Sequence, residues 1–94
     1  MAREPRKILK NDFMKAKALS SYKLARETKM PDTRVHGILK GKRKITYDTA
    51  LKFAKYFGNS AEFWIGIQNE CDLRKERVAI KELLSQIRPL KIAS

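Results

Sequence analysis

The chain of 94 residues contains a single cysteine, a single histidine, three prolines and four glycines. One cysteine cannot close a disulfide within the chain, and Cys71 with His36 supplies too few ligands for a zinc site. No apolar run approaches the roughly 20 residues that span a bilayer, and the basic start of the chain lacks the apolar stretch of a secretory signal. We therefore expect a cytoplasmic protein without a metal, a cofactor or a membrane contact.

Negative charge is also scarce, because 22 lysines and arginines outnumber 10 aspartates and glutamates and give a net charge of +12. Residues 1–44 hold fourteen of the basic and four of the acidic side chains, whereas residues 45–94 hold eight and six. Such one-sided positive charge attracts a polyanion such as nucleic acid. A solvated surface explains a charged run as well, so the sequence pattern that accompanies the charge must decide between these two interpretations.

Apolar residues recur at helical spacing along almost the whole chain, and no long window alternates as a strand would. We therefore predict an all-α protein. On the fourth helix, Ala50, Leu51, Ala54 and Phe57 are expected to share the buried face. The helices are expected over residues 6–17, 21–28, 31–40 and 47–57, with a fifth that starts after Ser60.

Residues 20–44 carry the most informative pattern, because two short helices joined by a tight corner are followed at once by a cluster of positive charge. Ser20 can cap the first helix, Pro31 can start the second, and Gly41 can stop it. A DNA-binding helix-turn-helix has this arrangement, and its second helix lies in the major groove. The sequence therefore predicts a protein that contacts DNA through residues 31–40.

The outward side of this second helix is expected to meet base edges. Thr33 can touch a thymine methyl group or donate a hydrogen bond, and Arg34 can pair with guanine or with a phosphate. Asp32 could accept a hydrogen bond from cytosine, although we favour a role in the helix dipole. His36 is either an ordinary exposed residue or a contact to a base or phosphate. Gly37 indicates either a close approach of the backbone to DNA or a tolerated glycine.

Phosphate contacts are expected at the edges of the motif. Ser21 can offer its hydroxyl and its backbone N–H at the start of the first helix. The loop after the second helix gathers further basic residues, namely Lys40, Lys42, Arg43 and Lys44. If about four of these groups neutralise phosphates, log affinity should fall with log salt at a slope of about −3 to −4 per subunit.

A single reading helix covers only a few base pairs, so useful specificity needs two half-sites and hence two copies of the chain. The fifth helix and the charged segment behind it offer apolar surface for a second copy or another partner. The residues predicted for this surface are Trp64, Ile67, Leu73, Ile80 and Leu84. Core packing is the competing role for the aromatic residues around Trp64.

The segment beyond Asp72 is highly charged but keeps its apolar residues at helical spacing. It either extends the fifth helix or forms a sixth, and Pro89 is expected to end it. We therefore predict a helix-turn-helix domain over residues 1–73 and a charged helical extension over residues 74–94.

The run GKRKITYDTALKFAKYFGNSAEFW at residues 41–64 and the shorter motifs EPRKIL, YKLA, MPDTRV and IQNECDL carry a similarity that reaches about Leu73. Together they resemble the HigA-type antitoxins, the branch of the phage-repressor-like helix-turn-helix family that includes virulence-associated protein I. One departure is Lys29 at the corner between the two helices, where such proteins commonly have glycine. A left-handed backbone there costs a lysine roughly 1 kcal/mol.

The resemblance implies a fold of five helices and a homodimer that binds a palindromic operator in double-stranded DNA. It also implies repression of the protein's own operon and neutralisation of a HigB-like toxin that cleaves mRNA. By position, it implies that Thr33 and Arg34 lie on the reading helix and that Ser21 meets a phosphate. Lys40, Lys42 and Lys44 fall in the loop that contacts the DNA backbone.

Two other functions compete with this interpretation. A stand-alone or phage-type transcriptional regulator would share the DNA chemistry but would have no toxin partner. An enzyme such as a small nuclease is disfavoured, because the sequence shows no carboxylate cluster and no nucleophile–base pair, and we predict no catalytic residue.

Overall fold

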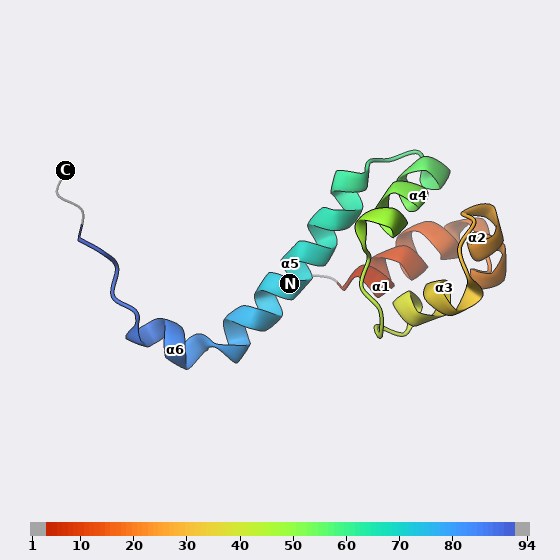
Figure 1. Ribbon diagram of the computed structural model, residues 1–94. Coiled ribbons are helices and arrows are strands. Elements are labelled where there is room, and N and C mark those ends of the chain that lie inside the picture. The colour runs from red at the N-terminus through yellow and green to blue at the C-terminus, as the bar shows by residue number, and fades with distance from the viewer. Residues whose placement is uncertain (1–3, 92–94) are drawn as a thin grey trace.

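The computed structural model describes residues 4–91, in which the regular elements are all helices joined by turns and loops, with no strand (Figure 1). The prediction of an all-α protein is confirmed. The first helical segment begins as a regular α-helix, continues as a wider π-helix and ends in a tighter 3₁₀ turn. The elements are α1 (Pro5–Ile8), its continuations Leu9–Met14 and Lys15–Lys17, α2 (Ser21–Glu27), α3 (Asp32–Leu39), α4 (Tyr47–Phe57), α5 (Ala61–Ala79) and α6 (Lys81–Gln86).

The corner between α2 and α3 follows from local backbone chemistry. The hydroxyl of Ser20 caps α2 by accepting a hydrogen bond from the backbone N–H of Lys23 at 3.1 Å. Lys29 adopts a left-handed conformation, with φ of 59°, at the position where the resembling family commonly has glycine. The next N–H, on Met30, then donates to the carbonyl of Ala25 at 2.9 Å and closes the end of α2. Lysine thus fills a position that favours glycine, and the corner forms nonetheless.

The later helix ends are set in the same way. Pro31 is extended and directly precedes α3, so α3 starts at Asp32, one residue later than we predicted. Thr46 caps α4 through the N–H of Thr49, and Ser60 caps α5 through the N–H of Phe63. Gly58 ends α4 in the left-handed conformation, with φ of 76°.

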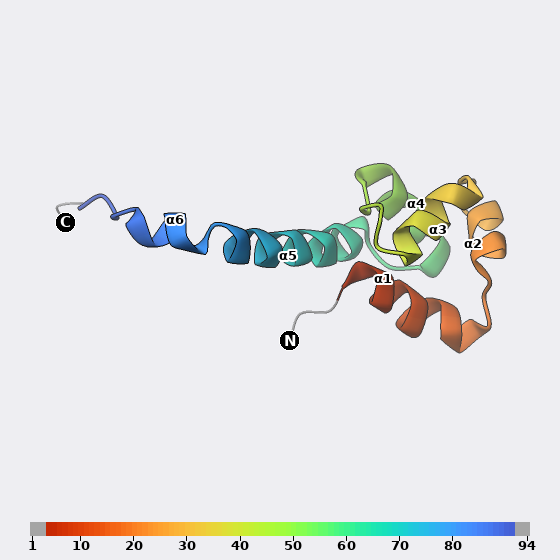
Figure 2. The ribbon, with the colours of Figure 1, turned by 90° about the horizontal axis from the view of Figure 1, so that it is seen from below.

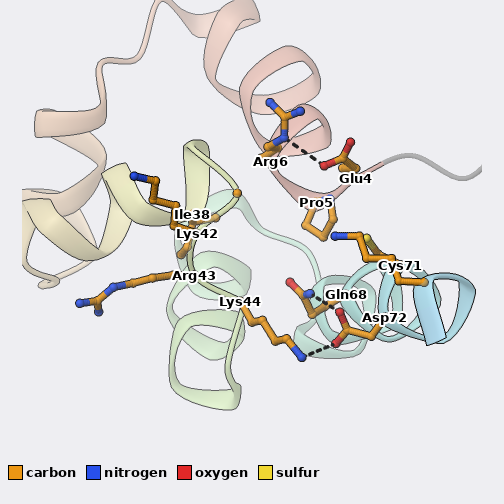
Figure 3. A pocket seen from close by; sticks show the side chains of 12 residues that line it. Glu4, Pro5, Arg6, Ile38, Lys42, Arg43, Lys44, Gln68, Cys71 and Asp72 are labelled. Carbon is orange, nitrogen blue, oxygen red and sulfur yellow. Dashed lines mark hydrogen bonds and ion pairs between the residues drawn. The ribbon is translucent and has the colours of Figure 1, made fainter. Parts of the chain in front are cut away.

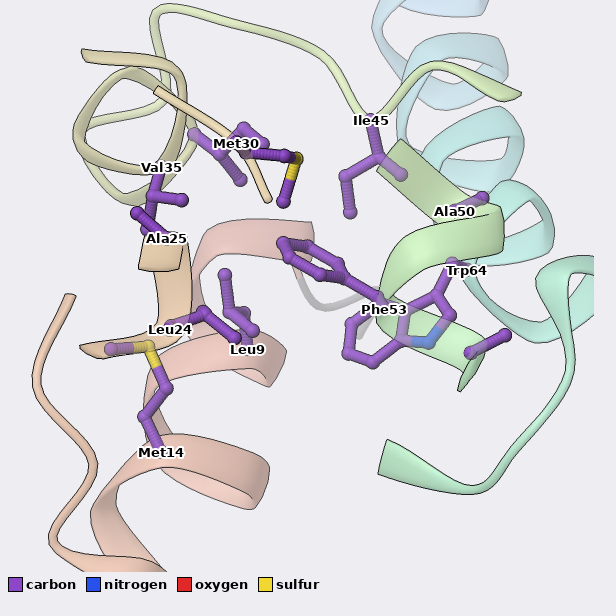
Figure 4. Close-up of a cluster of buried hydrophobic side chains, with 12 residues drawn as sticks. Leu9, Met14, Leu24, Ala25, Met30, Val35, Ile45, Ala50, Phe53 and Trp64 are labelled. Carbon is purple, nitrogen blue, oxygen red and sulfur yellow. The ribbon is translucent and has the colours of Figure 1, made fainter. Parts of the chain in front are cut away.

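The core lies where α1 to α4 and the first half of α5 meet, as Figure 4 shows. Trp64 is fully buried and its ring centroid lies 4.8 Å from that of Phe13 and 5.2 Å from that of Phe53. Leu24, Val35 and other apolar residues of the helix-turn-helix pack into the same cluster. The core therefore fixes α3 against α1, α2 and the aromatic group of α4 and α5.

The prediction for the buried face of α4 was wrong at one position. Leu51 is 63% exposed, whereas Phe53 is fully buried beside Ala50 and Ala54. Each residue turns an α-helix by about 100°, so Leu51 lies well away from the direction of Ala50. Phe53, three residues after Ala50, returns to the buried side.

The arm, which we define as residues 73–91, projects from the body formed by residues 4–72 (Figure 2). The molecule measures 55 × 26 × 22 Å and its radius of gyration is 17.0 Å, against about 12 Å for a compact chain of this length. The predicted domain boundary at Leu73 falls within α5, which continues to Ala79. The division into a domain and an extension stays a prediction.

A separate sixth helix forms in the arm, because α5 ends at Ala79 and α6 begins at Lys81, with Ile80 between them. α6 ends at Gln86, before Pro89, and Ile87 is already extended. A residue that precedes proline disfavours helical geometry, so Arg88 cannot continue α6 easily. Pro89 thus ends the helix by restricting Arg88, and α6 ends earlier than predicted.

Candidate nucleic-acid interface

α3 directs its apolar residues into the body and its polar residues outward. Val35 and Ile38 are buried, with 0% and 1% of their surface exposed. Asp32, Thr33 and His36 are exposed. The other two predicted base-reading residues, Arg34 and Gly37, are half-buried at the edge of this exposed arc.

His36 lies against the start of the neighbouring helix. Its Nε2 lies 3.3 Å from the hydroxyl of Ser21, the residue predicted to contact a phosphate. Lys10, Lys15 and Lys40 line the hollow that these two side chains share. The three lysines give the hollow the positive charge that would bind an anionic group. Lys40, which follows the C-terminal end of α3, lines this hollow together with Ser21.

Arg34 is held by a carboxylate from α4. Its guanidinium donates a hydrogen bond to Oδ2 of Asp48, and Nζ of Lys52 binds the same oxygen at 2.9 Å. Lys52 and Arg34, as hydrogen-bond donors and as nearby positive charges, lower the pKa of the Asp48 carboxyl from its ordinary value. Asp48 is therefore ionised at neutral pH.

Gly37 is required by the loop that follows α3. A Cβ at this position would lie 2.8 Å from both Cγ and Cδ of Arg43, which is closer than real carbon contacts. The backbone N–H groups of Lys42 and Arg43 also donate to the carbonyl of Gly37, at 2.8 and 3.1 Å. Gly37 therefore provides the space across which the stem of Arg43 lies, a reason that neither of our two interpretations from the sequence included.

The basic loop, residues 40–44, is attached to α5 by a polar network (Figure 3). The side-chain oxygen of Gln68 accepts a hydrogen bond from the backbone N–H of Ile45 at 2.9 Å, and its nitrogen donates to Asp72 at 3.0 Å. Asp72 in turn pairs with Nζ of Lys44 at 3.3 Å. Figure 3 shows Lys44 extending toward Asp72 and Arg43 pointing away from it.

This network separates the predicted phosphate-binding residues of the loop. Lys44 is engaged with α5, although 71% of its side chain stays exposed. Lys42 and Arg43 are exposed and form no ion pair within residues 4–91. Among residues 4–91, Lys40, Lys42 and Arg43 therefore present charges of the loop that form no ion pair.

Asp48, Gln68 and Asp72 were not predicted as site residues from the sequence. Asp48 is far from Arg34 in sequence, so no local pattern indicated that the two side chains meet. Gln68 is only 8% exposed and lies four residues after Trp64, on the inward side of α5. A polar residue within an apolar stripe was the one available signal, because buried polar groups need hydrogen-bond partners.

The predicted partner surface divides into buried and exposed residues. Trp64 is fully buried, so the indole packs inside the body and offers nothing to a partner, which corrects that part of the prediction. Ile67 packs against the core and Ile80 is half-buried. Leu73 and Leu84 are 54% and 44% exposed on the arm.

The lone cysteine and the lone histidine lie on different helices and in different surroundings. Cys71 is a buried free thiol on α5, and His36 is exposed on α3. In the part of the chain that the structure describes, no three His, Cys, Asp or Glu side chains gather as metal ligands. Between residues 4 and 91, every helix is too short or too polar to cross a membrane.

Comparison with known proteins links this geometry to a family. The family profile described as Helix-turn-helix matches residues 12–64. Virulence-associated protein I of Dichelobacter nodosus is 36% identical over 70 residues, which cover 74% of this chain, and the chain spans 65% of the length of that relative. The solved structure of Pseudomonas aeruginosa antitoxin HigA with the higBA promoter is 32% identical, has a TM-score of 0.92 and covers 97% of this chain and 100% of its own. The structure of antitoxin GraA in complex with its operator is 26% identical, has a TM-score of 0.89 and covers 98% of this chain and 94% of its own.

These similarities extend over both parts of the molecule. The helix-turn-helix profile includes α2, α3, α4 and the start of α5. The similarity to antitoxin HigA covers the body and the arm together. The chain therefore belongs to the HigA-type antitoxins of the helix-turn-helix family.

Proposed function

We propose that this protein is an antitoxin that binds operator DNA as a homodimer, represses its own operon and neutralises a HigB-like toxin. The observation that carries the DNA-binding part is the exposed arc of α3, which lies between the lysine-lined hollow at Ser21 and the basic loop. Two related antitoxins of known structure are bound to promoter or operator DNA. An operator-binding protein acts in the cytoplasm, where its DNA lies. The proposed function is binding and not catalysis.

In this proposal α3 enters the major groove, and Thr33, Arg34 and His36 lie nearest the base edges. Asp32, in the first turn of α3, is proposed to stabilise the helix dipole and not to contact a base. Ser21 and Lys40 contact the phosphate backbone at the hollow that they both line, and Lys42 and Arg43 contact it from the loop that follows α3. Lys44 adds charge while it is tied to Asp72.

Replacing Arg34 with alanine should weaken binding to the operator more than binding to random DNA. A guanidinium that donates two hydrogen bonds to guanine is worth about 1–3 kcal/mol of discrimination, whereas a phosphate contact adds equally to all sequences. Titration of a labelled promoter fragment and of a random duplex of equal length measures both affinities. An equal loss on the two duplexes would assign Arg34 to a phosphate.

We propose that the arm supplies the dimer contact. Leu73, Leu84 and neighbouring apolar residues of α5 and α6 are exposed on a thin projection that packs against little of its own chain. Burying a leucine side chain contributes about 1.5–3 kcal/mol, so pairing of two arms would stabilise both. A two-fold dimer would also match a palindromic operator with half-sites about one helical turn apart.

Aspartate at both Leu73 and Leu84 should convert the dimer to a monomer at micromolar concentration, because four apolar side chains would be replaced by charges in one interface. Light scattering after size-exclusion chromatography measures the mass directly. Leu90→Asp is the matched control, since Leu90 is 85% exposed beyond α6. A double variant that stays dimeric would place the contact elsewhere, and a monomeric wild type would contradict the dimer itself.

The toxin partner rests on the family rather than on a surface of this molecule. The competing interpretation is a stand-alone regulator that binds DNA without a toxin. Co-expression with the product of the adjacent gene, followed by a pull-down, separates the two. Copurification and relief of growth arrest would support the antitoxin, whereas a lack of any toxin-like neighbour would favour the regulator. Cleavage of DNA by the pure protein with a divalent metal would contradict a purely binding role.

A further inference from the structure

Asp48 is an acidic side chain placed among basic ones on the surface that is proposed to face DNA. The hollow around it is lined by Arg34, Arg43, Lys44 and Lys52. Its carboxylate is 54% exposed and lies in the first turn of α4, next to the outward arc of α3. A negative charge near phosphates opposes binding, so its presence there requires an explanation.

Stability explains little of this arrangement. Exposed ion pairs contribute little to the free energy of unfolding, because solvent screens them and both side chains lose freedom. A carboxylate in the first turn of a helix also favours the dipole, but α5 has the same feature in Glu62 without any basic cluster described around it. Asp48 differs from Glu62 in what it touches, which is the side chain of Arg34.

We propose that Asp48 is a specificity-determining positioning residue, which holds the guanidinium of Arg34 over the base edges and away from the phosphates. This inference rests on the proposed binding of operator DNA. The bond to Asp48 uses one terminal nitrogen of Arg34, and the other terminal nitrogen and Nε keep donors for a base. Lys52 binds the same carboxylate oxygen and fixes it in turn.

A free arginine and a held arginine behave differently toward DNA. The side chain of arginine has many rotamers, and ordering it on a base opposes binding. A guanidinium already fixed by a carboxylate loses less freedom when it meets guanine, and it reaches a phosphate less readily. Asp48 therefore lowers affinity for random DNA and raises the preference for the operator, and its removal should reverse both effects.

The variant Asp48→Asn removes the charge and preserves the shape. We expect affinity for a random duplex to rise about 3- to 10-fold, because one repulsive charge is lost at close range. We expect the ratio of operator to random affinity to fall about 10-fold, because Arg34 is no longer held over a base. Titrations of the operator fragment and of a random duplex of equal length, at matched salt, give both numbers.

Two controls separate this role from a structural one. Glu62→Gln removes a carboxylate from the same position in the first turn of α5 and should leave the affinity ratio unchanged. In an Arg34→Ala background, Asp48→Asn should no longer change the ratio, since the side chain it positions is gone. Thermal melts of all variants check that α4 is intact.

The outcomes distinguish the inference from the function on which it rests. A wild-type protein that prefers its operator, with the same ratio in Asp48→Asn, would overturn the positioning role and leave the proposed function standing. An equal rise on both duplexes would also overturn it, because Asp48 would then act as a plain repulsive charge. A wild-type protein without any operator preference would overturn the proposed function and the inference together.

Discussion

Alanine at both Lys42 and Arg43 is expected to weaken binding to operator DNA and to random DNA by the same factor. Among residues 4–91, neither side chain forms an ion pair, and charges of this kind release counterions from the phosphates of any sequence. Near 0.1 M salt we expect a loss of about 10-fold or more. The slope of log affinity against log salt should become shallower by about 2 per subunit.

The measurement is a set of titrations between low and moderate salt, with one duplex of each kind. Alanine at Lys81 and Lys91 removes the same charge from the arm, far from α3 in Figure 2, and should change the slope little. Retained affinity in the loop variant would place the backbone contact elsewhere. A loss confined to the operator would mean that the loop reads bases.

Trp64→Ala is expected to lower the free energy of unfolding by about 3–5 kcal/mol, a large part of the stability of a small domain. The indole is fully buried, packs against Phe13 and Phe53, and donates a hydrogen bond from Nε1 to Asn59 at 2.8 Å. Its removal would leave a cavity between α1, α4 and α5. Trp64→Ala should therefore lower the stability of the fold that positions α3, although Trp64 is not proposed to contact DNA.

Urea titration followed by circular dichroism measures this loss, at several protein concentrations because association would add to apparent stability. Tyr47→Ala is the matched aromatic control, since Tyr47 is 77% exposed and should cost within about 0.5 kcal/mol. A loss below about 1.5 kcal/mol for Trp64→Ala would contradict the central position of the indole in the core.

Much of the fold could be predicted because its signals are local. Ser20, Thr46 and Ser60 each accept a hydrogen bond from an N–H three residues later, so a short stretch of sequence contains both partners. The left-handed turn at Lys29 follows the backbone of the family that the chain resembles, which commonly has glycine there, although Lys29 itself is a departure from that pattern. Local chemistry of this kind defines helix ends without any knowledge of tertiary packing.

The parts that the sequence did not indicate depend on contacts between distant residues. Asp48 meets Arg34, and Gln68 meets the backbone of Ile45, only after α4 and α5 pack against the helix-turn-helix. Trp64 was offered as partner surface because size and apolarity suit an interface as well as a core. The buried side of α4 was misjudged at Leu51 because neighbouring positions differ by about 100° and several apolar residues compete.

Arg43 lying across Gly37 limits how the operator preference of this protein could be engineered. A library that diversifies α3 can vary residues 33 and 36, whose side chains are exposed, and residue 34, whose side chain is half-buried and paired with Asp48. Any side chain at position 37 would displace the stem of Arg43, and with it the phosphate contact that we propose for Arg43, in every member of the library at once. The reading helix therefore offers fewer independent positions for retargeting than its exposed arc suggests, and a designer should treat residues 37 and 43 as a single unit.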